Sequence, residues 1–224
     1  QNAGRRAFGR VDLRRALTVS SDVYFYNLGA QLWINRANPQ YGETAIQDVA
    51  AELGFGEQTG VPLPSESKAR LATPELRARM HDENPTAWPA SRWFTGDNVS
   101  LAIGQGELTV TPIQLANAYA TYANNGTRHS PNIALRVQEQ DGTLVRAIAP
   151  RVVERLEIPP AARDSIMAGF VGAVADPEGT AYNAFAGFPL DRFPIAGMGG
   201  RTMASKSPKK ARCLIATTAR TSSS

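Results

Sequence analysis

The spacing of apolar residues predicts that helices dominate this chain. Apolar side chains recur with helical spacing in residues 11–17, 23–33, 44–53 and 159–174, a pattern typical of helices buried along one face. Residues 20–22 are polar and interrupt the first two of these helices. Asp12 is suited to the start of the first helix, because a short side chain with an oxygen accepts hydrogen bonds from its free N–H groups.

The clearest helix start in the sequence lies at Thr111. Threonine is a favoured N-cap residue, Pro112 fits the first helical position, and Gln114 completes a capping box with the threonine. The helix is expected to continue through an alanine-rich stretch and to end at residues 124–126, which read Asn-Asn-Gly.

The sequence contains fewer patterns that predict strands than patterns that predict helices. Residues 134–139 and 143–146 flank an Asp-Gly turn and predict a hairpin. Residues 54–72 predict a loop with a short extended piece, and residues 77–94 predict irregular structure because they are polar and contain two prolines. The expected fold class is therefore mixed α/β (α+β), with the helices dominating.

Composition excludes several classes of protein. The apolar fraction of 42% is that of a globular chain, and no window approaches the 18 consecutive apolar residues of a membrane-spanning helix. The single cysteine, Cys213, excludes an internal disulfide and makes a cysteine-based metal site implausible.

The positive charge of the chain comes from its end. The net charge is +4, yet residues 198–224 hold six Lys and Arg side chains and no acid, so that residues 1–197 are slightly acidic. Lys68 is the only lysine before residue 198. Apolar periodicity also disappears there. We expect residues 198–224 to form a basic tail that is either disordered or translated from a different reading frame.

Residues 20–22, Ser-Ser-Asp, are the candidate catalytic residues. Ser20 and Asp22 place a hydroxyl and a carboxylate two positions apart, beside a helix rich in aromatic residues. Proton transfer needs polar groups at a fixed spacing, because their heavy atoms must approach to about 2.6–3.2 Å. The alternative is ordinary helix capping, which serine and aspartate also perform.

Three blocks together resemble the transpeptidase domain of class B penicillin-binding proteins, most closely the type that acts in lateral wall elongation. They are SSDVYFYNLG at 20–29, GDNVSLAIGQGELTVTPIQLANAYATYANNGT at 96–127 and GTAYNAFAGFPLDRFPIAG at 179–197. The middle block is the most specific. The resemblance implies that residues 1–197 are a partial transpeptidase domain. It would be the helix-rich part of a fold like that of penicillin-binding proteins and β-lactamases, with its central antiparallel sheet incomplete.

The resemblance also implies a chemistry. Such enzymes cross-link peptidoglycan stem peptides by acyl transfer through a serine, and penicillin acylates the same serine. Ser20 would hydrogen-bond the lysine of the nucleophile motif and pass protons to the leaving amine, and Asp22 would hold that lysine and part of the donor peptide. Gly104, Gln105 and Gly106 would shape a loop beside the substrate site without taking part in the chemistry.

The family further implies the setting of the intact protein. One N-terminal membrane anchor, absent from this chain, would hold the enzyme at the outer face of the cytoplasmic membrane. It would work beside a membrane glycan polymerase, bind stem peptides and β-lactams, and need no metal or organic cofactor. No nucleic-acid partner is expected.

Two motifs of the family have no convincing match in this sequence. A Lys-Thr-Gly strand should follow Gly197, but Met198 stands in the place of its lysine. The Ser-x-x-Lys nucleophile motif should precede Gln1. Residues 65–68, Ser-Glu-Ser-Lys, match by letters only, because they lie in a polar loop and follow Ser20 in the chain. We therefore expect this fragment to be inactive alone, with apolar surface exposed where sheet is missing.

Other functions remain open at this point. A D,D-carboxypeptidase or a serine β-lactamase is disfavoured by the long Gly-Gln-Gly block and by the Ser-x-Asp variant of the motif. An alternative from a different class is a non-catalytic binding module whose basic tail attaches to nucleic acid or to an anionic membrane. No amphipathic helix or aromatic interleaving accompanies the tail charges.

Overall fold

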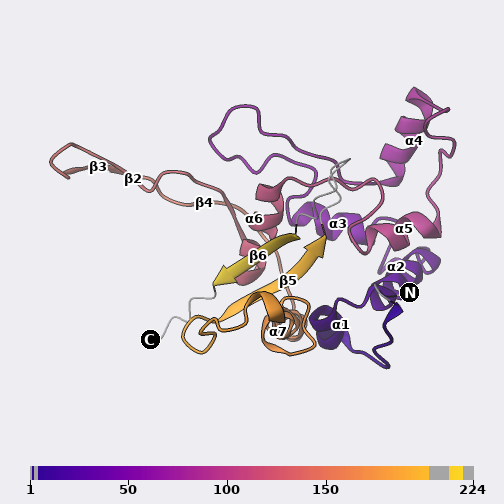
Figure 1. Cartoon of the computed structure of the whole chain (residues 1–224). Coiled ribbons are helices and arrows are strands. Elements are labelled where there is room, and N and C mark those ends of the chain that lie inside the picture. Colours follow the sequence, from indigo (N-terminus) through magenta and orange to yellow (C-terminus); the bar gives the residue numbers. More distant parts are fainter. Residues whose placement is uncertain (1, 3–4, 202–211, 219–224) are drawn as a thin grey trace. The chain divides into compact units, whose positions relative to one another are not determined.

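A computed structural model describes residues 2, 5–201 and 212–218 (Figure 1). The chain forms two compact units. Unit 1 combines Gln1–Asn27 with Ile158–Ser224, and unit 2 is Leu28–Glu157. The boundary at residues 27 and 28 falls inside helix α2 (Asp22–Ile34). Each unit is described below by itself. Within the described ranges, no helix is both long and apolar enough to cross a membrane.

Unit 1 is built on the packing of two helices. Helix α1 (Leu13–Val19) begins where the Asp12 side chain accepts a hydrogen bond from the Arg15 backbone, as its sequence predicts. Helix α7 (Pro160–Ala175) starts behind two prolines, also as predicted. The helices approach closely because α7 presents glycine to α1. A Cβ atom on Gly169 would lie 2.7 Å from the Leu17 Cβ.

Of the remaining elements of unit 1, two pack on α7 and the third pairs with one of these. The three elements are the 3-10 helix η2 (Tyr182–Ala184), strand β5 (Ile195–Arg201) and strand β6 (Arg212–Thr218). Val174 of α7, Ala181 and Ile195 of β5 form one buried cluster. The two strands are antiparallel, with Ile195 opposite Thr218 and Arg201 opposite Arg212. Figure 1 shows them side by side next to α7.

Two segments after Gly197 form strands, which the loss of apolar periodicity did not predict, while the expectation of a disordered or frameshifted tail stays a prediction. Strand β5 continues through Met198 to Arg201, and residues 212–218 pair with it. The pattern missed them because a two-stranded antiparallel pair satisfies its backbone groups whether or not the side chains alternate. For residues 202–211 and 219–224 the expectation lies outside the described residues. The proposed change of reading frame stays a prediction.

Unit 2 contains four further helices and four strands. The helices are α3 (Ala45–Glu52), α4 (Pro74–Glu83), α5 (Thr95–Leu101) and α6 (Pro112–Ala123). Their core is a cluster of Ala72, Trp93 and Leu101, against which Trp33, Ile46 and Leu108 pack. Helix α6 has the predicted capping box: Thr111 accepts from the Gln114 N–H, and Gln114 accepts from the Thr111 N–H.

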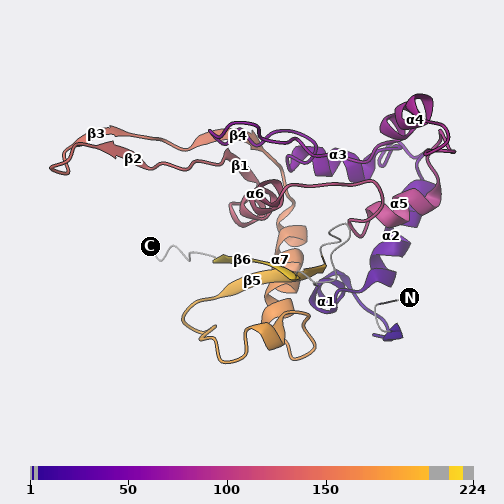
Figure 2. The ribbon, with the colours of Figure 1, turned by 45° about the horizontal axis from the view of Figure 1, so that its top comes forward.

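The strands of unit 2 form two separate antiparallel pairs. Strand β1 (Thr127–Ser130) pairs with β4 (Arg151–Arg155), and β2 (Arg136–Gln138) pairs with β3 (Leu144–Ala147) across the predicted Asp-Gly turn. Figure 2 shows the β2–β3 hairpin extending beyond β1 and β4. In the described ranges every sheet has two strands, and no central sheet joins them. The mixed, helix-dominated fold class is confirmed.

One helix replaces structure that was expected to be irregular. Helix α4 occupies residues 77–83 of the range 77–94, whereas α5 begins after that range, at Thr95. Thr73 caps α4 by accepting a hydrogen bond from the Leu76 N–H, with Pro74 at the first helical position. The helix was missed because its residues are mostly polar and carry no continuous apolar stripe.

Candidate active site

Ser20 lies at the junction between α1 and α2, in a left-handed backbone conformation. It is the C-cap residue of α1, with φ 54° and ψ 60°. The Ser21 N–H donates to the Ala16 carbonyl at 2.8 Å, which closes the end of the helix. Non-glycine residues seldom adopt this conformation, because the Cβ crowds the backbone. The turn therefore places three polar residues in a tight break between two helices.

The serine that caps α2 is Ser21, not Ser20. The Ser21 Oγ accepts from the Tyr24 N–H at 3.4 Å and donates to the Asn2 Oδ1 at 3.3 Å. Asn2 also accepts from the Val23 N–H at 3.1 Å. Ser21 is almost completely buried, with 2% of its surface exposed. The capping explanation thus accounts for Ser21 and leaves its two neighbours unexplained.

The side chains of Ser20 and Asp22 are partly exposed and have no partner in the described part of the chain. Asp22 lies in the first turn of α2, where a negative charge is favourable near the helix N-terminus. A hydroxyl and a carboxylate that are fixed by the backbone but not used internally are available to external groups. This arrangement suits hydrogen bonding to a cation or an amine.

Several contacts with α7 and the segment after it fix the position of the junction. The Thr18 Oγ1 donates to the Gly169 carbonyl of α7 at 3.4 Å, and Arg15 forms ion pairs with Asp176 and Glu178. The Thr180 N–H donates to the Thr18 carbonyl. These bonds hold the last turn of α1, so the orientation of Ser20 depends on α7.

The candidate loop of Gly104, Gln105 and Gly106 lies in unit 2. Both glycines have positive φ angles, +69° and +78°, which explains why glycine is needed there. The Gly104 N–H donates to the Leu101 carbonyl and the Gln105 N–H to the Ser100 carbonyl, so that the loop folds back on the end of α5. Ser20 and Asp22 belong to unit 1.

Two arginines hold the residue that follows this loop, and the sequence did not reveal them. The Arg70 Nε donates to the Glu107 carbonyl at 2.9 Å, and the Arg77 guanidinium pairs with the Glu107 carboxylate and with Asp97. Only 8% of the Glu107 side chain is exposed. No signal in the sequence links these positions, because the pairs join residues 20 to 37 positions apart.

Residues 65–68 do not form a nucleophile site. Ser65, Ser67 and Lys68 are exposed and lie in a loop, as expected. Glu66 has a structural role instead: it accepts hydrogen bonds from the Thr59 N–H and Oγ1 and from the Gly60 N–H. Burial acts to raise the pKa of Glu66, but these hydrogen bonds outweigh it and lower the pKa below its ordinary value of 4.5.

At the position expected for the lysine of the third motif, β5 carries Met198. It lies opposite Ile215 of β6. A thioether has no charge to bind a carboxylate. In the described ranges, no group of three or more His, Cys, Asp or Glu side chains is arranged to hold a metal ion. The expectation that no cofactor is needed stays a prediction.

Comparison with known proteins gives the family. Residues 1–197 match the model of the penicillin binding protein transpeptidase domain. The chain is 37% identical over 125 residues to the peptidoglycan D,D-transpeptidase MrdA of Acinetobacter baumannii, covering 56% of this chain and 16% of that protein. It is 30% identical over 202 residues to MrdA of Haemophilus influenzae, covering 86% of this chain and 26% of the relative.

A solved structure agrees with these matches. PBP2 of Pseudomonas aeruginosa, solved in complex with WCK 5153, superposes with a TM-score of 0.64 at 26% identity, over 85% of this chain and 38% of that one. The chain thus spans only a fraction of the length of its relatives. Because the family model covers nearly all residues before the basic tail, the chain belongs to the penicillin-binding protein transpeptidase domain family.

Proposed function

We propose that this chain is part of an elongation-type peptidoglycan D,D-transpeptidase, which cross-links stem peptides by acyl-serine transfer and is acylated by β-lactams. The family match and the names of the MrdA relatives support this proposal. The observation that carries it is that the three residues 20–22 differ in their hydrogen bonding. Ser21 caps the helix, whereas Ser20 and Asp22 keep their polar groups for outside partners.

In this proposal Ser20 and Asp22 act on a lysine that accompanies the nucleophilic serine. The Ser20 hydroxyl both accepts and donates hydrogen bonds, so it can take a proton from the lysine ammonium and give one to the leaving amine. The Asp22 carboxylate stabilises the ammonium form by charge. The left-handed turn fixes both residues at the junction between two helices. Because their backbone is already ordered, little further entropy is lost when the transition state forms.

The chain alone should not react. The nucleophile motif and the Lys-Thr-Gly strand have no convincing match in residues 1–224, and we propose that sequence outside this chain supplies the nucleophile. Without nucleophile, lysine or oxyanion donors, acyl transfer loses the interactions that supply most of its rate. Gly104, Gln105 and Gly106 serve only to shape the edge of the substrate site.

A shifted reading frame after Gly197 would explain the missing strand motif. The family model ends at residue 197, and the segment that begins there contains three of the four lysines of the chain and no acidic residue. Translation of the source DNA in its other two frames tests this part of the proposal. We expect one frame to give Lys followed by Thr or Ser and Gly, and then alternating apolar residues. If neither frame does so, the tail belongs to the protein.

The setting follows from the family resemblance. We propose that the longer protein has one N-terminal membrane anchor, acts on the outer face of the cytoplasmic membrane and works beside a glycan polymerase. Its ligands are stem peptides and β-lactams.

Fluorescent penicillin tests the proposed function. Residues 1–224 should remain unlabelled, whereas the protein translated with its flanking sequence in the corrected frame should form a covalent adduct that survives denaturation. A longer protein that folds, and yet stays unlabelled at saturating penicillin, contradicts the proposal.

A further inference from the structure

A pocket beside helix α4 is separate from the residues discussed so far. It has a volume of about 470 Å³ and lies entirely within unit 2. Its walls combine two cations, one carboxylate, an amide, an aromatic ring and apolar side chains. The lining residues are Arg70, Leu76, Arg79, Met80, Glu83, Asn84 and Trp88.

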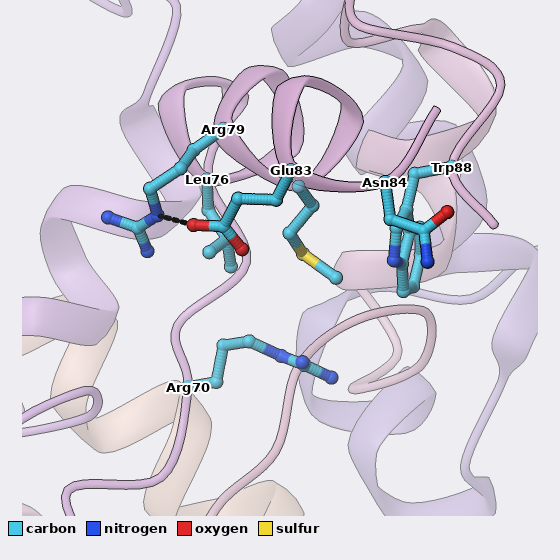
Figure 3. A pocket seen from close by; sticks show the side chains of 7 residues that line it. Arg70, Leu76, Arg79, Glu83, Asn84 and Trp88 are labelled. Atoms are coloured by element: carbon cyan, nitrogen blue, oxygen red, sulfur yellow. Dashed lines mark ion pairs between the residues drawn. The ribbon is translucent and has the colours of Figure 1, made fainter. Parts of the chain in front are cut away.

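Arg70 provides a fixed cation on the wall opposite α4. Its backbone is bound to Thr109 through two hydrogen bonds, of 3.1 and 2.9 Å, and its Nε donates to the Glu107 carbonyl. Its two terminal nitrogens have no partner in the described residues. Figure 3 shows this side chain crossing the space below α4, with the guanidinium toward the side of Asn84 and Trp88. The free edge of a planar guanidinium suits a bidentate anion.

The end of α4 forms the second wall. The Trp88 backbone N–H donates to the Asn84 carbonyl at 2.9 Å, and the Trp88 backbone carbonyl contacts the His81 Nδ1 at 2.7 Å, so the backbone that carries the indole is bound to the end of α4. The Asn84 Oδ1 accepts from the Ala87 N–H, which leaves the amide nitrogen of Asn84 as a donor. Leu76 and Met80 add apolar surface between these groups.

The charged side chains at the rim of the pocket determine its net charge. Arg79 and Glu83 are exposed and 3.9 Å apart, a pair that contributes little in water. With Arg70, the pocket carries a net charge of about one positive unit. Leu76, Met80 and Trp88 add apolar surface that an anion with an apolar group can cover and inorganic phosphate cannot, so the lining favours an organic anion.

We propose that the α4 pocket binds an organic monocarboxylate that carries an apolar group. The carboxylate pairs with Arg70 and accepts from the Asn84 amide. The apolar group lies against Leu76, Met80 and the Trp88 ring. Both a peptide C-terminus and a small acylated amino acid have this chemistry.

Binding at this pocket also reaches the Gly104–Gln105–Gly106 loop. The same guanidinium that would receive the carboxylate already holds the carbonyl of Glu107, the residue after Gly106. A carboxylate bound to the other edge of the Arg70 guanidinium restricts this side chain and so stiffens its contact with the Glu107 carbonyl. The amide groups of Gly104 and Gly106 should therefore respond to the ligand although they do not line the pocket.

A titration of the full chain tests the proposal. N-acetyl-L-leucine is added while the Trp88 indole N–H and the Gly104 and Gly106 amides are followed by NMR. Saturable shifts with a dissociation constant on the order of 1 mM are expected for a ligand of this size. N-acetyl-L-leucinamide, which lacks the charge, and inorganic phosphate should each bind at least about tenfold more weakly. Acetyl-Gly-Gly-Leu, which has a free carboxylate, distinguishes the two ligand classes. If the pocket takes a peptide C-terminus, this peptide should bind at least as tightly as N-acetyl-L-leucine. If it takes a small acid, the peptide should bind more weakly.

Three variants connect the binding to the named residues. Arg70→Gln should weaken binding of the acid about tenfold or more, and Glu83→Gln should strengthen it about two- to fivefold, because it removes the repelling charge. Arg92→Gln is the matched control: this arginine lies over Phe94 outside the pocket and should leave binding unchanged. Glu83 is exposed, so its variant remains informative even if Arg70→Gln fails to fold.

The following results would overturn the proposal: no saturable binding, equal binding of the acid and the amide, tighter binding of phosphate, or no change in affinity with Glu83→Gln.

Discussion

At the scale of single residues, the central feature is the contrast between three adjacent side chains. Ser21 is buried and bonded to the start of α2, while Ser20 and Asp22 are partly exposed and unpartnered among the described residues. Ser20 also adopts a conformation that costs roughly 1–2 kcal/mol for a residue with a Cβ. Strain of this kind often persists at functional sites. Position 20 carries a serine although a glycine would adopt this conformation at lower cost.

Ser20→Gly should therefore stabilise the chain. Removal of the Cβ relieves the left-handed strain, and the greater freedom of glycine in the unfolded state offsets part of that gain. A net increase of about 0.5–1 kcal/mol in the free energy of unfolding is expected from chemical denaturation. The control is Ser165→Ala, whose hydroxyl bonds only to its own helix at the Ala161 carbonyl. A clear loss of stability with Ser20→Gly would show that the hydroxyl supports the fold.

Glu66 gives the loop of residues 57–68 a pH dependence. Its pKa is lower in the folded chain than in the unfolded one, so the contribution of its carboxylate to stability is complete above the ordinary value of 4.5. This contribution is lost as the pH falls through the folded pKa. Thermal unfolding between pH 6 and pH 3 should show a smaller decrease in Tm for Glu66→Gln than for the unchanged chain. An equal decrease would contradict the assigned hydrogen bonds.

At the scale of elements, the sequence predicted what local chemistry determines. The caps at Asp12 and Thr111 and the Asp-Gly hairpin turn were confirmed because each depends on neighbouring residues. Helix α4 carries the same Thr-Pro start as α6, but its lack of an apolar stripe concealed it. Strands β1 and β4 are short and polar, and only pairing between distant residues makes them strands. The Arg77 ion pairs could not be predicted either, because they also join residues that are distant in the sequence.

The crossing of α2 and α5 in unit 2 depends on one glycine. A Cβ atom on Gly29 would lie 2.8 Å from both the Ala102 Cβ and the Asn98 carbonyl oxygen, and the Asn98 amide donates to the Gly29 carbonyl. Gly29→Ala should lower the free energy of unfolding by about 1–3 kcal/mol, because the helices must separate. Gly96→Ala is the control, since nothing lies within 4 Å of its added Cβ. It should be neutral or stabilising. Equal effects of the two substitutions would contradict the close crossing.

At the scale of the whole molecule, the two units have small cores. Within the ranges that the structure describes, two buried apolar clusters each centre on three residues, and many large apolar side chains are exposed, including Leu135, Ile133 and Ile34. In the described residues all sheets are two-stranded, and an isolated pair of strands is only marginally stable in water. The fold of the family is recognisable, but much of the apolar surface has no cover in this chain.

Exposed apolar surface should make residues 1–224 bind a hydrophobic dye at low temperature. Dye fluorescence during a thermal scan should be high at the start and should change little at a broad unfolding transition, because much of the apolar surface is already accessible. The longer protein should show low initial fluorescence and a sharp transition. A sharp, cooperative transition of residues 1–224 without initial dye binding would contradict this expectation.

The central claim is that Ser20 and Asp22 serve acyl transfer rather than the fold. The most direct test is the rate at which fluorescent penicillin acylates the longer protein, compared among the unchanged protein, Ser20→Gly, Asp22→Asn and the Ser165→Ala control. The account predicts that the first two variants react at least about 100-fold more slowly while their folds remain intact, and that the control is unaffected. Acylation of Ser20→Gly and Asp22→Asn at the unchanged rate would contradict it.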